Sequence, residues 1–336
     1  MRSERVAVLM GGPSSEHDVS LASGAQILRV LDGRWPTLRV EIQRDGAWRI
    51  GQGERARSLS TVGAALDALK DGADVVFIGL HGVFGEDGTV QALLETLGLP
   101  YVGSGIGASA LAMDKARAKA IYRAHGLPTP RSLHLAPGEP GADADIAAMH
   151  PCVVKPSASG SSFGVSFPAD GAAAVAAVRD HLSRGLEVVV EEVIRGRELT
   201  CGVLDHPDGP RPLPVTAIVP SAEHAFFDYV AKYTPGATDE ITPAPIPDAL
   251  RDEVQRLAVA AHRALGCRDL SRTDVMVSQD GSPLLLETNT LPGFTETSLL
   301  PQAAIAAGMS FGGLVDHLLE RALGRATAGP AGSQAG

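Results

Sequence analysis

The sequence near the C-terminus reads Arg272-Thr273-Asp274-Val275-Met276-Val277-Ser278 and then Leu284-Leu285-Leu286-Glu287-Thr288-Asn289. Asp280-Gly281 lies between the two segments, and this dipeptide favours a two-residue turn between antiparallel strands. A turn centred there predicts a β-hairpin in which Asp274 faces Glu287 and Arg272 faces Asn289.

Side chains alternate between the two faces of a strand, so this hairpin has an apolar face and a polar face. The apolar face is predicted to contain Val275, Val277, Leu284 and Leu286. The polar face is predicted to contain Arg272, Asp274, Glu287 and Asn289. Two opposed carboxylates, roughly 5 Å apart at Cβ, repel unless a cation lies between them, and oxygen-bearing side chains suit Mg²⁺. The hairpin therefore predicts a magnesium platform; the alternative is a solvated face neutralised by Arg272.

The composition is that of a globular protein with a small-molecule partner. The chain has 336 residues, 44% of them hydrophobic, and a net charge of −10 without a basic block. This balance disfavours nucleic acid and anionic membranes as main partners. The three cysteines are far apart and indicate neither a disulfide framework nor a zinc site. No apolar run approaches the roughly 20 residues of a membrane span, so we expect a cytoplasmic protein.

The N-terminal part alternates between expected strands, at 6–10 and 75–80, and expected helices, at 19–30 and 61–70. This alternation predicts an α/β fold with a parallel sheet covered by helices. The turn after the first strand, Gly11-Gly12-Pro13-Ser14-Ser15-Glu16, lacks the G-x-G-x-x-G spacing. A nicotinamide-dependent dehydrogenase is therefore disfavoured.

Further along, a helix over 116–126 is expected to end before Pro128-Thr129-Pro130, which suggests a domain joint. Expected strands follow at 152–156 and 186–192, and an expected helix at 251–265. Residues 220–247 contain five prolines and no sustained helical or strand period, so they form a candidate lid.

The chain has five lysines: Lys70, Lys115, Lys119, Lys155 and Lys232. Lys70 and Lys119 fall in polar helical stretches and need no special explanation. The other three lie beside glycine-rich or aromatic segments, where an ammonium can meet phosphate. The loop at 157–164 follows Lys155 and offers small residues and several N–H groups. That arrangement predicts a phosphate cradle, although a Gly/Ser-rich hairpin tip has a similar sequence.

A second glycine-rich segment, His81-Gly82-Val83-Phe84-Gly85-Glu86-Asp87-Gly88-Thr89, follows the expected strand at 75–80. Ligands bind at this edge of open α/β sheets. For Glu86 and Asp87 we favour charge placement at a helix N-terminus, whereas a structural and a functional role are equally open for His81. Glu16 has the same topological position and can hold an ammonium group.

Several of these segments together resemble the D-alanine:D-alanine ligases of the ATP-grasp superfamily. The resemblance runs from about residue 5 to 323, with the motifs in family order. The matching segments are residues 10–20, 81–89, Gly103-Ser104-Gly105 with Met113-Asp114-Lys115, the Lys155 loop, Phe227-Asp228-Tyr229-Val230-Ala231-Lys232-Tyr233, and residues 287–295.

The resemblance implies a three-domain ATP-grasp architecture. Its parts are a Rossmann-like N-terminal domain at 1–112, a central subdomain at 113–200, a C-terminal subdomain at 201–323 with a lid at about 220–247 and a metal hairpin at 271–290, and a tail at 324–336 expected to be disordered. It also implies a cytoplasmic homodimer that makes D-alanyl-D-alanine for peptidoglycan precursors, with ATP as co-substrate and two Mg²⁺ ions, or Mn²⁺ in their place.

The resemblance implies roles for individual residues as well. Contact with ATP is implied for Lys115, Lys155, Ser162, Glu191, Glu198 and Lys232. Metal binding is implied for Asp274, Glu287 and Asn289. A network around the first D-alanine is implied for Glu16, Ser161 and Tyr233. Contact with the intermediate or the second substrate is implied for His81, Arg272, Gly293, Ser298 and Leu299.

Two positions depart from the family pattern. Ser159 stands where many relatives carry Glu, and Glu192 stands where a Lys is often found beside the adenine, which bears on nucleotide affinity. Tyr233 favours the dipeptide over D-alanyl-D-lactate. The alternatives are a D-alanine:D-lactate ligase, a specialised D-amino-acid ligase on the same scaffold, and a nucleotide-binding protein without ligase activity.

Overall fold

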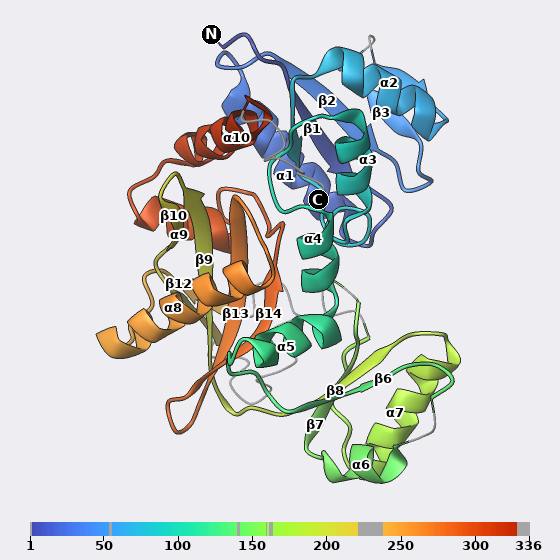
Figure 1. The fold of residues 1–336 in the computed structure, drawn as a ribbon, viewed down its shortest axis with the longest axis vertical. Helices are drawn as coiled ribbons and strands as arrows, with labels where there is room; N and C mark the ends of the chain where they lie inside the picture. Colours follow the sequence, from blue (N-terminus) through green and yellow to red (C-terminus); the bar gives the residue numbers. More distant parts are fainter. Residues whose placement is uncertain are drawn as a thin grey trace, which may run out of the picture.

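The structure is a computed structural model that describes residues 2–53, 56–139, 142–158, 160, 164–220 and 238–327. The strands of this described part form three sheets of five, three and six strands, each with its own helices (Figure 1). The predicted α/β class is confirmed. In the same residues no helix has both the length and the apolar character needed to span a bilayer.

The N-terminal sheet has the strand order β4-β3-β2-β1-β5. Its strands are β1 (Val6–Gly11), β2 (Thr37–Ile42), β3 (Trp48–Ile50), β4 (Arg57–Leu59) and β5 (Val75–Ile78). Its helices are α1 (His17–Leu31), α2 (Val62–Gly72) and α3 (Thr89–Leu97). β1 pairs in parallel with β5, as predicted, and also with β2, where no strand was predicted. It is buried along its whole length, which suits an uninterrupted apolar strand covered on both faces. β3 and β4 add an antiparallel edge, so the prediction of a parallel sheet was right only for its centre.

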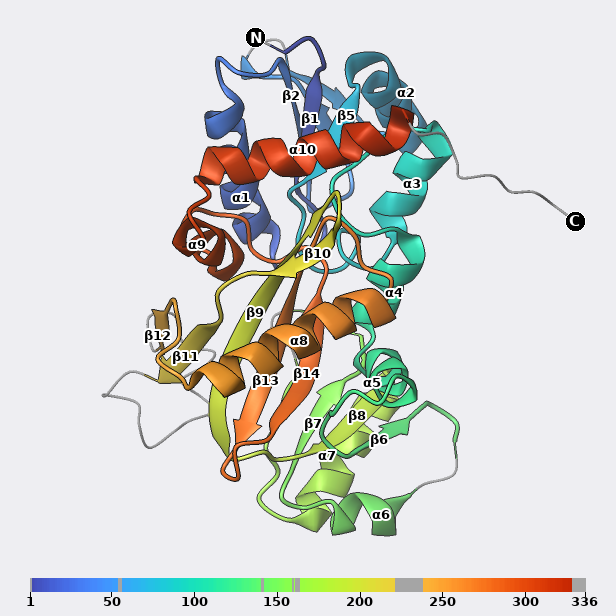
Figure 2. The same ribbon diagram turned by 60° about the vertical axis from the view of Figure 1, so that its left-hand side comes forward.

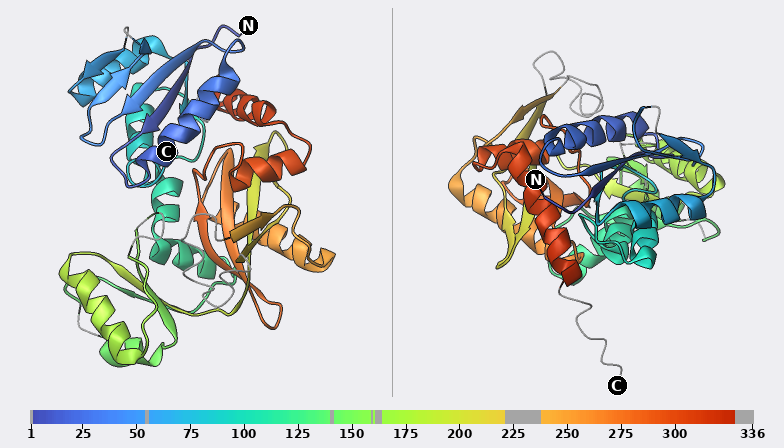
Figure 3. Two further views of the ribbon diagram at one scale, coloured as in Figure 1. Left: turned by 180° about the vertical axis from the view of Figure 1, so that it is seen from behind. Right: turned by 90° about the horizontal axis from the view of Figure 1, so that it is seen from above.

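The three-stranded sheet, ordered β6-β8-β7, is antiparallel and forms the lower lobe in Figures 1 and 3. It is reached through α4 (Ile106–Met113) and α5 (Lys115–Ala124). The lobe contains β6 (Ser132–Leu135), α6 (Asp143–Ala148), β7 (Cys152–Pro156), α7 (Gly171–Ser183) and β8 (Val188–Glu192). The predicted strands at 152–156 and 186–192 correspond to β7 and β8.

The six-stranded sheet contains the predicted hairpin and has the order β12-β11-β9-β13-β14, with β10 paired to β9. Its strands are β9 (Gly196–His206), β10 (Gly209–Pro212), β11 (Thr216–Pro220), β12 (Thr238–Ile241), β13 (Leu270–Ser278) and β14 (Pro283–Asn289). Its helix α8 (Asp248–Ala264) packs on one face through Val254, Leu257 and Ala261 (Figure 2). β12 pairs with β11 inside the candidate lid, where no strand was predicted. Residues 221–237 of that lid lie outside the described part.

The last two helices, α9 (Leu299–Ala306) and α10 (Phe311–Thr327), join the C-terminal sheet to the N-terminal one. α10 crosses the N-terminal sheet (Figure 2), and its Leu314 and Leu318 share a core with Val6, Val8 and Phe77 of β1 and β5. The first and last thirds of the chain therefore share an apolar core.

The hairpin of β13 and β14 confirms the key pairing but not the predicted turn. Asp274 faces Glu287 and Arg272 faces Asn289. The Ser278 N–H donates to the Ser282 carbonyl, so the strands are joined by the three residues 279–281, with Gly281 at a φ of +86°. The prediction of a two-residue turn was therefore wrong. The strands use the other common connection, a three-residue loop that ends in a left-handed glycine.

A β-bulge compensates for the longer loop. The register shifts between Asp274 and Val275, whose partner is Leu285, and Leu286 is the extra residue of β14. Consequently Leu285 packs in the core with Val275 and Val277, so the placement of Leu284 and Leu286 on that face was wrong. Leu286 lines the cavity on the opposite face together with Glu287.

Candidate active site

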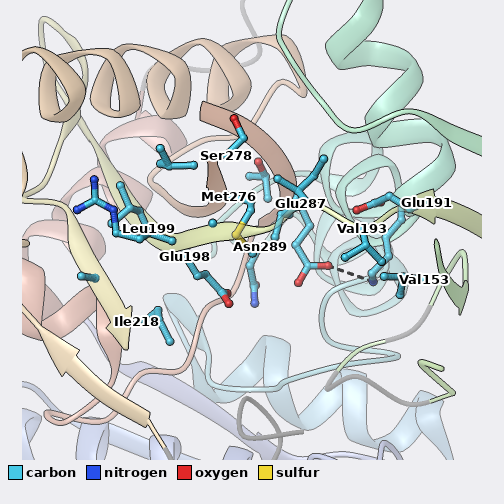
Figure 4. Close-up of a pocket in the computed structure, with 18 of the residues that line it drawn as sticks. Val153, Glu191, Val193, Glu198, Leu199, Ile218, Met276, Ser278, Glu287 and Asn289 are labelled. Carbon is cyan, nitrogen blue, oxygen red and sulfur yellow. Dashed lines mark ion pairs between the residues drawn. The ribbon is translucent and has the colours of Figure 1, made fainter. Parts of the chain in front are cut away.

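A cavity of about 1080 Å³ lies between the three-stranded and six-stranded sheets. Its apolar wall comes from both sheets and includes Val153, Val193, Leu199, Ile218 and Met276 (Figure 4). Leu286 also belongs to this wall. The N-terminal domain contributes Glu16 and Glu86. A slot with apolar walls and charged groups at its end is suited to a ligand with a flat apolar part and a charged part.

Two ion pairs lie on the cavity wall. Lys115 Nζ, from the first turn of α5, is 3.2 Å from Glu287 Oε2 (Figure 4). Lys155 Nζ, from β7, is 3.2 Å from Glu191 Oε2 of β8. Glu198 of β9 also lines the cavity. The predicted ATP-binding residues Lys115, Lys155, Glu191 and Glu198 are thus brought together.

The predicted metal ligands lie on the same hairpin face, at two depths. Glu287 and Asn289 line the cavity. Asp274 is nearly buried behind them and accepts hydrogen bonds from Arg272 Nε and Nη2, at 2.9 and 3.0 Å, and from Thr200 Oγ1, at 2.7 Å. The Asp274 carboxylate raises the pKa of Arg272 against the opposing effect of burial.

The donor set fits a hard cation, because two opposed carboxylates and an amide oxygen are typical ligands of Mg²⁺. Within the described residues no three His, Cys, Asp or Glu side chains form a metal cluster, so the set depends on the amide of Asn289. Asn289 Oδ1 accepts a hydrogen bond from the Leu291 N–H at 3.1 Å, which fixes its orientation.

Glu16 occupies a close-fitting position opposite the hairpin. A Cβ at Gly82 would lie 2.6 Å from Glu16 Oε2, and one at Gly160 would lie 2.7 Å from it, so the two glycines leave room for the carboxylate in this position. Burial raises the pKa of Glu16, Glu287 raises it further, and Lys115 opposes the shift. A partly buried carboxylate of this kind is suited to pair with an ammonium group.

The segment after β5 contains two acidic residues with different roles. Asp87 Oδ1 accepts from the Thr89 N–H at the start of α3, as predicted. Glu86 is instead buried and accepts from the Gly82 N–H at 2.7 Å, and burial raises its pKa to about 8. The prediction that Glu86 places charge at a helix terminus was therefore wrong.

His81 is also buried, and both ring nitrogens are engaged. Nδ1 donates to the Leu291 carbonyl at 3.1 Å, so Nε2 accepts from Ser23 Oγ at 2.8 Å. Burial lowers the pKa of His81 to about 4, so the ring is neutral. His81 is not among the described residues that line the cavity, and this geometry supports the structural alternative.

Lys119 was not predicted to belong to the site. Its polar helical stretch suggested no special role, yet its side chain is 0% exposed and Nζ lies 2.9 Å from Glu191 Oε2. Helical spacing contains a usable signal, because Lys119 follows Lys115 by one turn and precedes buried Tyr122 by three residues on the same face of α5.

The remaining predicted residues lie near the site or outside the described part. Ser298 precedes Leu299, the first residue of α9, and a Cβ at Gly293 would lie 3.0 Å from Ser298 Oγ. These three residues follow β14 but are not among the described lining residues. Ser159, Ser161, Ser162, Lys232 and Tyr233 lie outside the described part. Glu192 binds the N–H and Nε of Arg131, at 2.8 and 2.9 Å, and is likewise not among the described lining residues.

Comparisons with known proteins show the family to which the chain is similar. The family model described as D-ala D-ala ligase N-terminus matches residues 5–104, and the one described as D-ala D-ala ligase C-terminus matches residues 132–320. A D-alanine–D-alanine ligase of Desulfotalea psychrophila is 44% identical over 324 residues, covering 95% of each chain.

Two solved structures are similar over nearly the whole chain. The D-alanine–D-alanine ligase of Bacillus anthracis complexed with ATP has a TM-score of 0.79 and 33% identity, covering 97% of this chain and 99% of that one. The VanG D-Ala:D-Ser ligase of Enterococcus faecalis has a TM-score of 0.80 and 30% identity, covering 95% and 99%. Since the two family models together match most of the chain, this protein belongs to the D-alanine–D-alanine ligase family.

Proposed function

We propose that this enzyme joins two D-alanine molecules into D-alanyl-D-alanine, with conversion of ATP to ADP and phosphate, for peptidoglycan precursor synthesis. The observation that carries the proposal is a single cavity lined by Lys115, Lys155, Glu287 and Asn289, with Asp274 opposite Glu287 on the same hairpin. Cations for a polyphosphate and oxygen ligands for a divalent metal are the parts that phosphoryl transfer requires.

We assign the nucleotide to the slot between the two sheets. Its base lies against the apolar wall near Glu191, with the ribose at Glu198. Lys115 and Lys155 then exchange their carboxylate partners for phosphate oxygens. Lys232 and Ser162, which lie outside the described part, are assigned to the same phosphates. The predicted homodimer and the domain boundaries remain predictions.

Glu287, Asn289 and Asp274 would hold the divalent metal, for which Mg²⁺ is the natural candidate and Mn²⁺ a substitute. The bound metal supplies neutralisation of the charge on the transferring phosphoryl group. Arg272 orients Asp274 through two hydrogen bonds, so the most deeply placed of the three side chains is held in position before a metal binds.

The reaction runs in two steps. A carboxylate oxygen of the first D-alanine attacks the γ-phosphorus, ADP leaves, and a D-alanyl phosphate forms. The amine of the second D-alanine, having lost a proton, then attacks the acyl carbon, and phosphate leaves. Glu16 would hold the first ammonium group with Ser161 and Tyr233. Arg272 and the Gly293 N–H would stabilise the tetrahedral oxyanion, at about 3 kcal/mol per donor, while the lid would exclude water from the acyl phosphate.

The test is phosphate release together with product mass, from purified protein supplied with ATP, Mg²⁺ and D-alanine. L-Alanine and D-lactate in place of D-alanine are the controls. Phosphate release with the mass of D-alanyl-D-alanine supports the proposal. A depsipeptide from mixed D-alanine and D-lactate would indicate the ligase alternative, and intact ATP binding without turnover of D-alanine would overturn the proposal.

A further inference from the structure

We propose that Lys119 is a positioning residue that holds the Glu191 carboxylate from behind the cavity and thereby leaves Lys155 available to the ATP phosphates. The inference rests on the proposed function, since it assigns a role within the nucleotide site. It concerns a residue that never touches the nucleotide.

The geometry places one carboxylate between two ammonium groups. Glu191 Oε2 lies 2.9 Å from Lys119 Nζ and 3.2 Å from Lys155 Nζ. Glu191 and Lys155 line the cavity, whereas Lys119 is fully buried and is not among the described lining residues. The two lysines therefore reach the same oxygen from different sides, one from the cavity wall and one from the protein interior.

Lys119 is anchored where it stands. Its Nζ donates to Thr129 Oγ1 at 2.8 Å, and Thr129 Oγ1 donates to the Leu285 carbonyl of β14 at 2.8 Å. The Leu285 N–H donates back to the Pro128 carbonyl at 2.8 Å. This chain of bonds ties Lys119 to the joint between the two sheets, so the ammonium group stays with Glu191 when other groups in the cavity move.

The charges give this arrangement a function. When a triphosphate draws Lys155 away, Glu191 would become a buried carboxylate without a cation if Lys119 were absent, and such a charge is strongly unfavourable. Burial lowers the pKa of Lys119 to about 8, with Glu191 opposing the shift, and the two lysines keep the pKa of Glu191 low. Lys119 thus lowers the free-energy cost of moving Lys155 from the Glu191 carboxylate to a phosphate.

The experiment measures ATP affinity by calorimetry with Mg²⁺ and no D-alanine, followed by steady-state kinetics. Lys119→Met removes the charge at similar length. We expect the Kd and the KM for ATP to rise about tenfold or more, a change of about 1.4 kcal/mol, while the KM for D-alanine and kcat stay within about threefold. Lys70→Met, at an exposed position of α2, is the matched control and should leave all four values unchanged.

A double variant tests whether Lys119 acts through Glu191. In a Glu191→Gln background the carboxylate charge that Lys119 compensates is gone, so adding Lys119→Met should change the Kd for ATP less than twofold. This comparison also holds if Lys119→Met alone fails to fold, because the double variant has no unpaired charge. An equal rise in both backgrounds, or an unchanged Kd in folded Lys119→Met, overturns the inference. Absence of dipeptide synthesis by the wild type would instead overturn the proposed function, since the calorimetry needs no turnover.

Discussion

Asp269 and Glu191 are both buried carboxylates with basic partners, in different regions of the molecule. Asp269 immediately precedes β13 and is fully buried. Both of its oxygens are bound by the Arg325 guanidinium of α10, and Oδ2 also accepts from the Gly103 N–H at 2.8 Å. Arg325 in turn donates to the Tyr101 carbonyl at 2.7 Å. Asp269 thus joins the C-terminal sheet, α10 and the loop that leads into α4.

Glu191 shares one of its two partners with the cavity. Lys119 lies behind it, and Lys155 lies on the cavity wall. None of the described groups bound to Asp269 lines that cavity. The difference teaches that a buried carboxylate is part of the framework when all its partners belong to the protein interior. It becomes part of a binding site when one partner can be taken over by a ligand.

The largest effect is expected from a substitution in the cavity, at Glu287 of the hairpin. Glu287→Gln removes a predicted metal ligand and the partner of Lys115. We expect kcat to fall on the order of a thousandfold, because a catalytic metal contributes several kcal/mol. Phosphate release at ordinary Mg²⁺ measures this. Asp280→Asn, in the exposed loop of the same hairpin, is the control and should be near normal. Near-normal turnover by Glu287→Gln would contradict the metal assignment.

Asp269→Asn tests the buried ion pair outside the cavity, because it leaves Arg325 without its buried anion. The free energy of unfolding should fall by about 4 kcal/mol, while the Kd of the folded protein for ATP stays within twofold. Urea denaturation and calorimetry measure the two quantities. Asp18→Asn disrupts an exposed pair with Arg44 and should cost less than about 1 kcal/mol. A large loss of ATP affinity in Asp269→Asn would contradict the conclusion that Asp269 contributes to stability and not to ATP binding.

Glu86 is a third buried carboxyl to compare with Asp269 and Glu191. Burial raises its pKa to about 8. The folded state holds this proton more tightly than the unfolded state does. The stabilisation is complete below about pH 4.5 and is lost as the pH rises through 8. Wild-type stability should fall between pH 5 and 8, relative to Glu86→Gln, by on the order of 3 kcal/mol.

Urea denaturation across this pH range measures the Glu86 effect. Glu296→Gln, at an exposed loop position, is the control and should leave the pH dependence of wild type intact. Parallel stability curves for wild type and Glu86→Gln would show that Glu86 is ionised in the folded protein.

The sequence predicted the opposed carboxylates correctly through two compensating differences. The loop at 279–281 is one residue longer than the predicted turn, and the bulge at Leu286 restores the register before Glu287. Hydrophobic alternation could not reveal this, because Leu284, Leu285 and Leu286 are chemically alike. Burial in the folded protein is what separates Leu285 in the core from Leu286 in the cavity.

Lys119 and Glu86 were missed for a different reason. Both are ionisable residues in segments that read as exposed helix or loop, and long-range contacts bury them. Lys119 of α5 contacts Glu191 of β8 and Thr129, and Glu86 folds back on Gly82. The strands β3 and β4 could not be predicted either, because each has only three residues and is too short to show a periodic pattern.

The bulge also has an evolutionary consequence. If Leu286 were deleted, Val275 would still pair with Leu285, and the next residue along, Glu287, would still face Asp274. The hairpin therefore tolerates the gain or loss of one apolar side chain on the nucleotide wall without displacing the acidic pair. The shape of the pocket and the position of its acids can diverge separately in descendants of this sequence, although both are encoded within a single hairpin.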